Sequence, residues 1–219
     1  MFITIEGVDG AGKTTHLPFI KEWMQNYTNH EAEVILTREP GGTALGANLR
    51  SILLSTPMTP VTQTLMFCAA RNDHLERVIW PAMQRGDVVI CDRFIDSTLA
   101  YQGVGGGSLD MVRNIQYAAM GDFHADLTLY FDVPLEVSKE RRGARGEATD
   151  VTEKTLDENF NTMRSIFLQE AADNPYRMKI IDASADIPTV QERIAQTLAD
   201  AMYEREQQAS RDTHYERMR

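Results

Sequence analysis

The sequence has few cysteines and no long apolar run. Its two cysteines, Cys68 and Cys91, each lie in an apolar segment, a pattern that favours two buried thiols in a reducing cytoplasm over a disulfide or a metal-binding pair. No run reaches the roughly 18 apolar residues that a membrane-spanning helix needs. The apolar segment that begins at Phe2 leaves no room for a secretory signal. We therefore expect a cytoplasmic protein with no membrane partner.

Positive charge is also scarce. The sequence has 22 lysines and arginines against 32 aspartates and glutamates, which gives a formal net charge of −10, and its five histidines show no metal-ligand spacing. Proteins that bind polymeric nucleic acid are usually basic, so we expect no nucleic-acid polymer as a partner. A small phosphorylated ligand would need a local group of arginines to offset the overall negative charge.

The N-terminal segment carries the clearest motif. Residues 2–5 form a short apolar run typical of a buried strand, and the pattern Gly-x-x-x-x-Gly-Lys-Thr follows directly. In a phosphate-binding loop of this type, backbone N–H groups and the start of the next helix point at the phosphates of a nucleoside triphosphate. The lysine can reach the β- and γ-phosphates, and the threonine hydroxyl can hold Mg²⁺. A glycine-rich turn that binds nothing is the alternative. The predicted ATP-binding residues are Gly7, Val8, Asp9, Gly10, Ala11, Gly12, Lys13, Thr14 and Thr15.

Strand and helix patterns alternate along the whole chain. This alternation predicts an α/β fold, a three-layer arrangement of the P-loop NTPase type with a five-stranded parallel sheet. We expect one domain over residues 1–205, with a flexible lid at about 143–152, and a charged, disordered tail over 206–219. The expected strands are residues 2–5, 34–36, 88–91, 127–131 and 178–181, and the expected helices are residues 13–27, 45–54, 61–85, 96–101, 109–120, 136–142, 153–172 and 187–203.

Two pairs of residues outside the loop are candidates for ligand binding. Asp92 closes an apolar strand and Arg93 follows it, which places a metal-holding carboxylate and a cation at the sheet edge where phosphates bind. A turn-forming aspartate is the alternative. Phe67 and Arg71 are four residues apart on one helix face, where a ring could stack on a base and a guanidinium could bind its edge. Taken alone, a core phenylalanine and a surface arginine are the simpler interpretation.

Two arginines in a glycine-interrupted segment suggest a lid. Arg141 and Arg145 are four residues apart, with Gly143 and Gly146 beside them. Such a segment fits a basic lid over a triphosphate and fits a solvated basic turn equally well. A GTPase would show Asn-Lys-x-Asp after a late strand, where this chain has Asp-Val-Pro at residues 132–134. The sequence also shows no hydrolysis or sensor apparatus of an ATPase motor or transporter.

Taken together, the motifs resemble the thymidylate kinase family over residues 2–203. The matching segments are residues 6–15, 37–43 and 65–71, and residues 92–94 with 97 and 101–103. The order and spacing of four motifs are far more specific than one loop. The resemblance implies the strand order 2-3-1-4-5, a homodimer, and Mg²⁺-dependent transfer of the γ-phosphoryl group of ATP to dTMP, giving dTDP for dTTP synthesis. The alternatives are a kinase for another nucleoside monophosphate and a non-catalytic nucleotide-binding regulator.

The resemblance also implies roles for single residues in the dTMP site. Asp9 is expected to bind the 3′-hydroxyl group, Phe67 to stack on thymine, and Arg71 to donate to a base carbonyl. Tyr101 is expected to fill the space near the 2′ position of the sugar. The remaining implied contacts are Arg38, Arg50 and Arg93 around the acceptor phosphate, Ser97 and Gln102 near the base, and Glu39 as an acidic residue of the same pocket.

The family resemblance finally points to the catalytic arginine. Gly10 follows Asp9, so the loop has no arginine at that place and the chain is similar to the bacterial type that carries arginines in the lid. Arg145 is the first candidate and Arg141 the second, with Arg142 between them. The metal ligands are expected to be Thr14 and Asp92, directly or through water. The expected catalytic residues are therefore Lys13, Asp9, Arg93, Arg145, Arg141 and Asp92.

Overall fold

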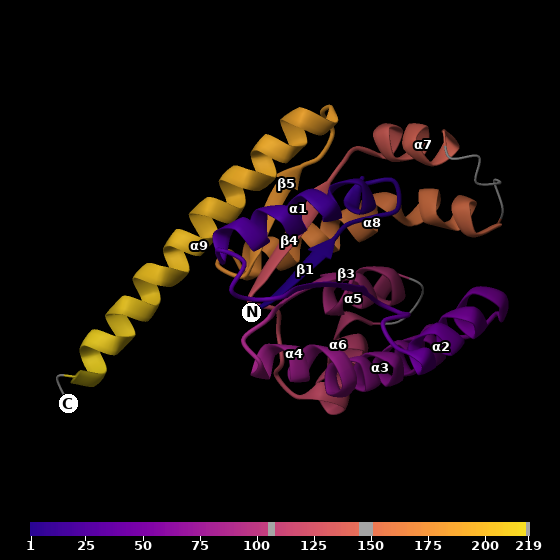
Figure 1. Cartoon of the computed structure of the whole chain (residues 1–219). Helices are drawn as coiled ribbons and strands as arrows, with labels where there is room; N and C mark the ends of the chain where they lie inside the picture. Colours follow the sequence, from indigo (N-terminus) through magenta and orange to yellow (C-terminus); the bar gives the residue numbers. More distant parts are fainter. Residues whose placement is uncertain (105–107, 145–150, 218–219) are drawn as a thin grey trace.

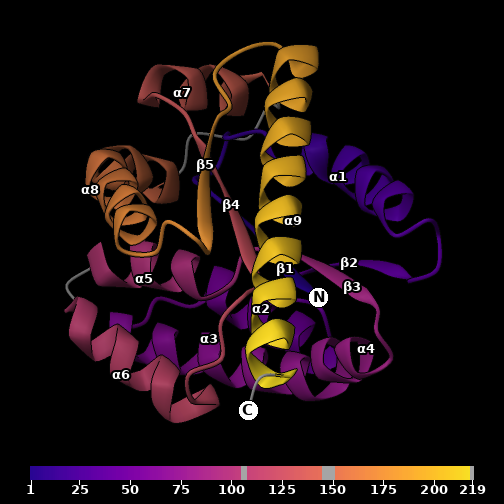
Figure 2. The same cartoon turned by 90° about the vertical axis from the view of Figure 1, so that its left-hand side faces the viewer.

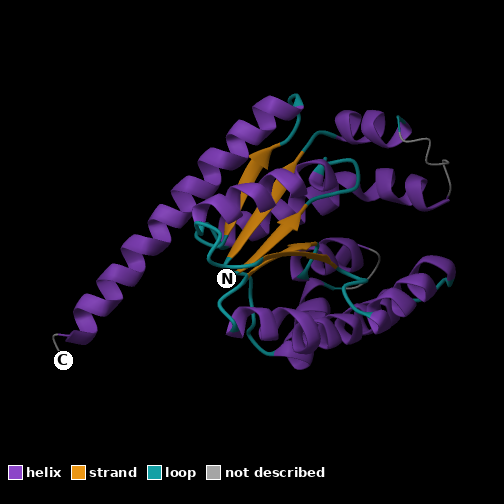
Figure 3. Ribbon diagram, in the orientation of Figure 1, coloured by secondary structure: helices purple, strands orange, loops and turns teal. Residues whose placement is uncertain are grey.

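The computed structural model describes the backbone of residues 1–104, 108–144 and 151–217, and the side chains of these residues except 151–156 and 209–217. Its strands form one parallel sheet in the order β2-β3-β1-β4-β5 (Figures 1 and 3). The predicted fold class and the predicted strand order are thus confirmed. The strands are β1 (Phe2–Glu6), β2 (Val34–Arg38), β3 (Val88–Asp92), β4 (Leu127–Asp132) and β5 (Met178–Asp182).

Helices cover both faces of the sheet, as right-handed crossovers between parallel strands require. Figure 2 shows α1 and α9 on one face, with α5 and α8 on the other. Within the described residues, none of the helices is both long and apolar enough to cross a membrane. The helices are α1 (Lys13–Tyr27), α2 (Ala44–Ser55), α3 (Pro60–His74), a π-helical turn (Leu75–Ile79), α4 (Trp80–Gln84), α5 (Ile95–Val104), α6 (Leu109–Met120), α7 (Leu135–Gly143), α8 (Val151–Asp173) and α9 (Ile187–Arg217).

The central strand β1 is buried along its whole length. Ile5 packs in a cluster that includes Ile20 of α1, while Phe2 packs in a second cluster, where its ring meets that of Phe94 edge-on at 5.0 Å. The buried hydroxyl groups of Thr4 and Thr128 are 2.7 Å apart and satisfy each other. This dense core holds the carboxyl ends of β1 and β3 in fixed positions, and the site lies at those ends.

The long helix expected over residues 61–85 is interrupted by the π-helical turn. Pro81 has no N–H group, so the helix cannot continue its regular hydrogen bonds there, and the Trp80 N–H group donates to Leu75 O instead. Leu75 and Ile79 are both fully buried in the second cluster. The wider turn therefore lets two apolar side chains reach the core beside the sheet.

The C-terminal segment also differs from the expectation. We predicted a helix ending at residue 203 and a disordered tail from 206, whereas α9 continues to Arg217 (Figure 1). No glycine or proline interrupts the sequence between Pro188 and Arg217, and side-chain contacts hold the helix where the tail was expected to begin. These contacts are the 3.0 Å ion pair of Glu204 with Lys179, the 2.9 Å ion pair of Arg205 with Asp126, and the 2.6 Å hydrogen bond from Tyr27 to Glu206.

Candidate active site

The loop between β1 and α1 has the backbone of a phosphate cradle. Gly7 and Gly10 have φ values of +142° and +82°, and a Cβ atom at either would come within 2.7 Å of Phe131 O or 2.6 Å of Ser138 O. Only glycine tolerates both the angle and the space. The Ser138 hydroxyl group of α7 donates to Asp9 O at 2.7 Å. The loop is therefore held from behind, with the first N–H groups of α1 facing the pocket.

Lys13 lies at the start of α1 and is almost fully buried. Its Nζ donates to Gly7 O at 2.8 Å and to Val8 O at 3.0 Å. Burial, and then the charge of Arg93, lower the pKa of Lys13 to about 8. The carboxylates of Asp92, Asp9 and Glu6 act in the opposite direction, and an anion bound in the loop would further favour the charged form.

The turn after β3 aims a guanidinium at this loop. Arg93 has a φ of +71°, and its N–H group donates to Ile5 O at 3.0 Å. The next N–H group, that of Phe94, donates at 2.7 Å to the buried carboxylate of Glu6. These bonds over-determine a backbone conformation that a non-glycine residue rarely adopts. Strained residues of this kind cluster at functional sites.

The Arg93 side chain ties the turn to the loop. Its Nη1 donates to Gly7 O and to Ser97 Oγ, each at 3.1 Å, and its Nη2 donates to Asp9 Oδ1 at 2.6 Å. The Arg93 guanidinium holds the pKa of the exposed Asp9 carboxyl group below its usual range. The structure thus brings two predicted site residues into direct contact: Asp9 of the phosphate loop and Arg93 of the turn after β3.

A polar pocket joins the loop to the arginines. Three elements supply its cations besides Lys13: Arg38 ends β2, Arg50 lies in α2, and Arg93 follows β3. Their convergence opposite a phosphate loop fits the binding of two phosphorylated ligands head to head. The pocket is lined by Asp9, Gly10, Ala11, Gly12, Lys13, Thr14, Arg38, Glu39, Arg50, Asp92 and Arg93.

Two oxygen-bearing side chains of the pocket fit a divalent cation. Asp92 Oδ1 is buried and has no hydrogen-bond partner among the described residues, and Thr14 is exposed at the pocket wall. Hydroxyl and carboxylate oxygens are the ligands that Mg²⁺ prefers. A buried carboxylate oxygen without a partner needs an explanation, and a cation or its water supplies one.

The α3 helix places Phe67 and Arg71 one turn apart, with the phenylalanine half-buried and the arginine buried. The arginine is more deeply anchored than the sequence suggested. Its Nε donates to Glu39 Oε2 at 2.7 Å, and the ring of Phe94 lies 4.9 Å from its guanidinium carbon. The remaining partners are Phe94 O at 2.9 Å, Thr98 Oγ1 at 2.8 Å and Gln116 Oε1 at 3.3 Å. The interpretation of Arg71 as a surface charge is therefore wrong.

Residues of α5 contact these groups from the other side. The Ser97 hydroxyl group donates to Glu6 Oε2 as well as accepting from Arg93. The Tyr101 ring lies 5.0 Å from the Arg93 guanidinium carbon, and its hydroxyl oxygen accepts from Arg93 Nη2 at 3.3 Å. Burial raises the pKa of Tyr101 to about 12, so it stays neutral. Gln102 instead donates to Gln63 at 3.3 Å, on α3.

The arginines expected at the lid are placed differently from one another. Arg141 donates to the carbonyl groups of Ala183 at 2.9 Å and Ala185 at 3.1 Å, and to Ala11 O of the phosphate loop at 3.5 Å. It connects the segment after β5 to α7 and is not among the residues that line the pocket. Arg141 thus lies beside the phosphate loop, and its expected role at the transferred phosphoryl group stays a prediction. Arg142 is buried and pairs with Asp157 at 2.5 Å. Arg145 lies outside the described residues.

Three polar residues of the site had no assigned role in the sequence interpretation. Glu6 anchors the Arg93 turn, Thr98 holds Arg71, and His74 bonds Glu39. The only sequence signal was weak: His74 follows Arg71 by three residues, so the two share a helix face. Burial of Glu6, then the charge of Asp96, raises its pKa to about 7.

Comparison with known proteins agrees with this geometry. Residues 5–194 match the family model described as "Thymidylate kinase". The chain is 46% identical over 200 residues to the thymidylate kinase of Burkholderia vietnamiensis and 45% identical to that of Burkholderia cenocepacia, covering 90% of this chain and 97% of each relative. This chain belongs to the thymidylate kinase family. The crystal structure of thymidylate kinase from Ehrlichia chaffeensis is similar at a TM-score of 0.69 and 32% identity, over 90% of this chain and 98% of that one.

Membership in the thymidylate kinase family confirms the predicted class of the protein. Thymidylate kinases are ATP-dependent nucleoside monophosphate kinases, so the chain is an enzyme of nucleotide metabolism. The interpretation as a non-catalytic regulator receives no support.

Proposed function

We propose that this chain transfers the γ-phosphoryl group of ATP to dTMP at the pocket between the phosphate loop and the Arg93 turn. The supporting observation is the convergence of Lys13 with three arginines from three different elements in one pocket. A triphosphate on the loop and a monophosphate at the arginines would meet there end to end. Phosphoryl transfer requires this in-line arrangement and little covalent chemistry from the protein.

The cations of the pocket would supply electrostatic stabilisation. Lys13 is held at the loop by two carbonyl groups and would turn to the β- and γ-phosphates once ATP is bound. Arg93, fixed in direction by Ser97 and Gly7, would bind the acceptor phosphate. Arg38 and Arg50 would share that phosphate. Because Arg93 is already oriented by these bonds, it would need little reorganisation as charge moves between the two nucleotides.

The nucleoside part of dTMP would lie along α3 and α5. Phe67 would stack on the thymine ring, and the anchored guanidinium of Arg71 would donate to a base carbonyl group. Asp9 would accept a hydrogen bond from the 3′-hydroxyl group. Tyr101, whose ring lies against Arg93, would occupy the space next to C2′. Each of these assignments rests on the family resemblance together with the position of the residue.

Mg²⁺ is the cofactor that the donor atoms fit. Thr14 and the buried oxygen of Asp92 would hold it, directly or through water. When bound, the ion supplies positive charge to the β- and γ-phosphates of ATP. Asp92 also accepts the N–H group of Glu39 at its carbonyl oxygen at 3.0 Å, so its backbone position is fixed before the ion arrives.

A coupled assay of ADP release over a panel of nucleoside monophosphates tests the proposal. We expect dTMP to be the preferred acceptor by kcat/KM. Lys13→Met should lower turnover far more than tenfold, a change in barrier above about 1.4 kcal/mol, and leave dTMP binding by calorimetry mostly intact. Lys21→Met, on the same helix outside the pocket, is the matched control. Preference for another monophosphate would shift the assignment within the kinase class, and ATP binding without turnover would revive the regulator.

We also propose that the protein is a cytoplasmic homodimer. The large exposed apolar side chains include several on α2, α3 and α6, helices that contact one another, and exposed apolar surface of this kind is typical of an interface. They are Leu45, Ile52, Leu54, Val61, Leu65 and Tyr117. Light scattering should give twice the chain mass. Leu54→Glu should shift it toward the monomer, while Tyr176→Glu, an exposed aromatic position before β5, should not. A monomeric wild-type protein would contradict the proposal.

A further inference from the structure

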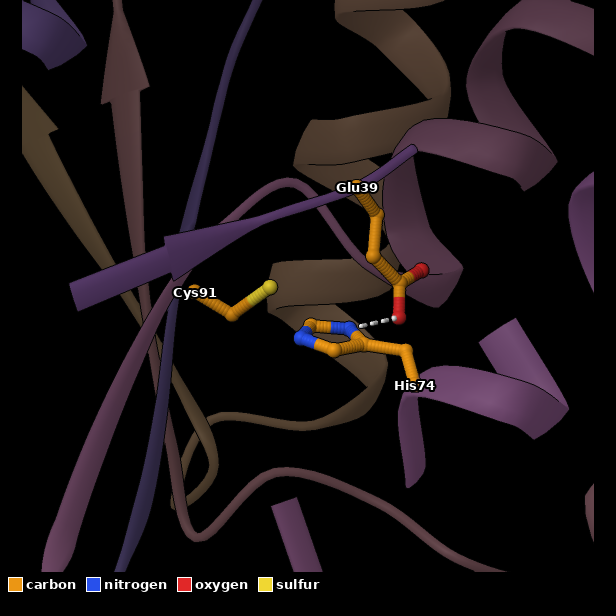
Figure 4. A group of neighbouring side chains, drawn as sticks. All are labelled: Glu39, His74 and Cys91. Atoms are coloured by element: carbon orange, nitrogen blue, oxygen red, sulfur yellow. Dashed lines mark hydrogen bonds and ion pairs between the residues drawn. The ribbon is translucent and has the colours of Figure 1, made fainter. Parts of the chain in front are cut away.

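Three residues with metal-ligating side chains meet behind the proposed base pocket. The ligand atoms of Glu39, His74 and Cys91 all lie within 4.8 Å of one another, and all three residues are buried. Figure 4 shows the side chains directed toward one another, with a hydrogen bond joining His74 to Glu39. The cluster fits either a metal site or a network that holds a neighbouring side chain, and the contacts of each atom decide between these.

The contacts argue against a metal ion. Both carboxylate oxygens of Glu39 are engaged, Oε2 by Arg71 at 2.7 Å and Oε1 by His74 at 3.0 Å. The Cys91 thiol donates to Arg93 O at 3.2 Å, and burial raises its pKa well above the usual value, so it keeps its proton. A guanidinium beside the carboxylate would in addition repel a cation.

The same contacts form a continuous chain from β2 to α3. Since a carboxylate can only accept, His74 Nδ1 carries the proton and donates to Glu39. The other ring nitrogen, Nε2, lies 2.7 Å from Thr37 Oγ1. Glu39 in turn accepts from Arg71. The ring therefore acts as a rigid spacer that fixes the position of the carboxylate between two elements.

Gly42, in the loop between β2 and α2, fits closely against this ring. A Cβ atom at Gly42 would lie 2.3 Å from His74 Nε2 and 2.7 Å from Thr37 Oγ1. The φ of Gly42 is not in the left-handed region, so space and not backbone angle requires glycine here. The close fit between the loop and the ring restricts how both can lie, and the orientation of Glu39 depends on both.

The orientation of Glu39 matters because it sets that of Arg71. Four of the five N–H groups of this guanidinium donate to described residues. Nε donates to Glu39, Nη2 to two oxygens and Nη1 to Gln116, which leaves one N–H group on Nη1 without a partner among the described residues. A single donor can select a base that offers a carbonyl group and reject one that offers an amino group, provided that its direction is fixed.

We propose that His74 is a positioning residue: with Thr37 and Gly42 it fixes Glu39 so that Arg71 selects a pyrimidine with a 4-carbonyl over one with a 4-amino group. This inference deepens the proposed function and rests on it. It predicts that disturbing His74 raises the KM for dTMP and reduces the preference for dTMP over dCMP, while kcat changes little. The reacting phosphates are bound by other residues, which is why the effect should be confined to the base.

The test compares His74→Leu with His74→Asn in the full chain. The asparagine amide can donate from nearly the position of Nδ1, whereas leucine cannot. We expect His74→Leu to raise the KM for dTMP about tenfold and to narrow the dTMP/dCMP ratio of kcat/KM by a similar factor, the scale of one hydrogen bond to a charged group. His74→Asn should recover most of both. His124→Leu, at a half-exposed position, is the control.

A second variant keeps the histidine and displaces it. Gly42→Ala should reproduce the narrowed ratio, and the double variant Gly42→Ala with His74→Leu should be no worse than His74→Leu, because both act through Glu39. Should His74→Leu fail to fold, Gly42→Ala carries the test. An unchanged dTMP/dCMP ratio in the folded variants overturns the proposal, and so does one zinc ion per wild-type chain by elemental analysis that is lost in His74→Leu. A wild-type enzyme that does not phosphorylate dTMP overturns the proposed function and this inference together.

Discussion

Glu6→Gln should make the free energy of unfolding less dependent on pH. Glu6 is fully buried at the end of β1, where it accepts from Phe94 N and Ser97 Oγ. Burial, and then the charge of Asp96, outweigh these bonds and the nearby Arg93, and raise the pKa from 4.5 to about 7. Between pH 4.5 and about pH 7, Glu6 therefore keeps its proton in the folded protein, whereas in the unfolded chain it has released it.

The sign and size of the effect follow from this difference. Because the folded state binds the extra proton, Glu6 contributes stability that is fully present below about pH 4.5 and is lost as the pH rises through about 7. The loss is at most about 3 kcal/mol in the free energy of unfolding. A glutamine cannot ionise, yet it retains an oxygen for Phe94 N. The stability of the variant relative to the wild type should therefore increase as the pH rises.

Urea unfolding of both proteins between about pH 5 and about pH 8 measures this gain. Groups such as Asp9 titrate in both proteins, so their contributions cancel in the difference between them. We expect the gap in unfolding free energy to shift toward the variant by about 1 to 3 kcal/mol over that range. Glu22→Gln, at an exposed position on α1, should leave the gap constant. A gap for Glu6→Gln that does not change with pH would show that the buried carboxyl group is already ionised at low pH.

Three further variants address the reaction. Tyr101→Ala should narrow the ratio of kcat/KM between dTMP and its 2′-hydroxylated analogue by about tenfold, because the ring that crowds and desolvates the hydroxyl group is gone; an unchanged ratio with equal losses would mean that the ring only supports Arg93. Arg145→Ala should lower kcat by about a hundredfold with little change in dTMP affinity, if it meets charge that develops in the transition state; a loss seen only in the KM for ATP would limit Arg145 to binding. Asp92→Asn should raise the Mg²⁺ concentration needed for half-maximal turnover about tenfold, and an unchanged Mg²⁺ titration would remove Asp92 from the metal site.

Local signals in the sequence predicted most of the fold. Each strand is a short apolar run bounded by turn residues, and the phosphate loop has a fixed spacing, so both could be read from neighbouring residues alone. The break in the long helix was not predicted. Pro81 lies in the first turn of α4, a position where proline is tolerated at the start of a helix, so the sequence did not show that the preceding helix is interrupted. The length of α9 escaped as well, since the partners of Arg205 and Glu206 lie far away in the sequence.

The sequence indicated which residues could gather at the site but not the contacts between them. From its sequence alone, Arg71 was interpreted as a surface charge, yet in space it is surrounded by residues 39, 94, 98 and 116. No pattern of spacing in the sequence predicts these four partners. Arg141 was expected to face the nucleotides because it is basic and close to the lid. In the fold it donates to the carbonyl groups that follow β5 and to Ala11 O of the phosphate loop, a set of partners that its spacing could not indicate. Long-range partners of this kind decide the role of a charged residue, and they follow from topology.

The contact between Arg93 and Asp9 has a consequence for how the acceptor binds. The guanidinium has a carboxylate partner at 2.6 Å, so an acceptor phosphate that binds Arg93, as proposed above, would replace one anion by another. Its net affinity is then the difference between two ion pairs and is smaller than the strength of either. In return, the cation is kept in one orientation and the empty pocket is spared unbalanced repulsion between Arg93 and Lys13. Asp9 would thus occupy the position of the phosphate, and its release would free it for the proposed contact with the sugar.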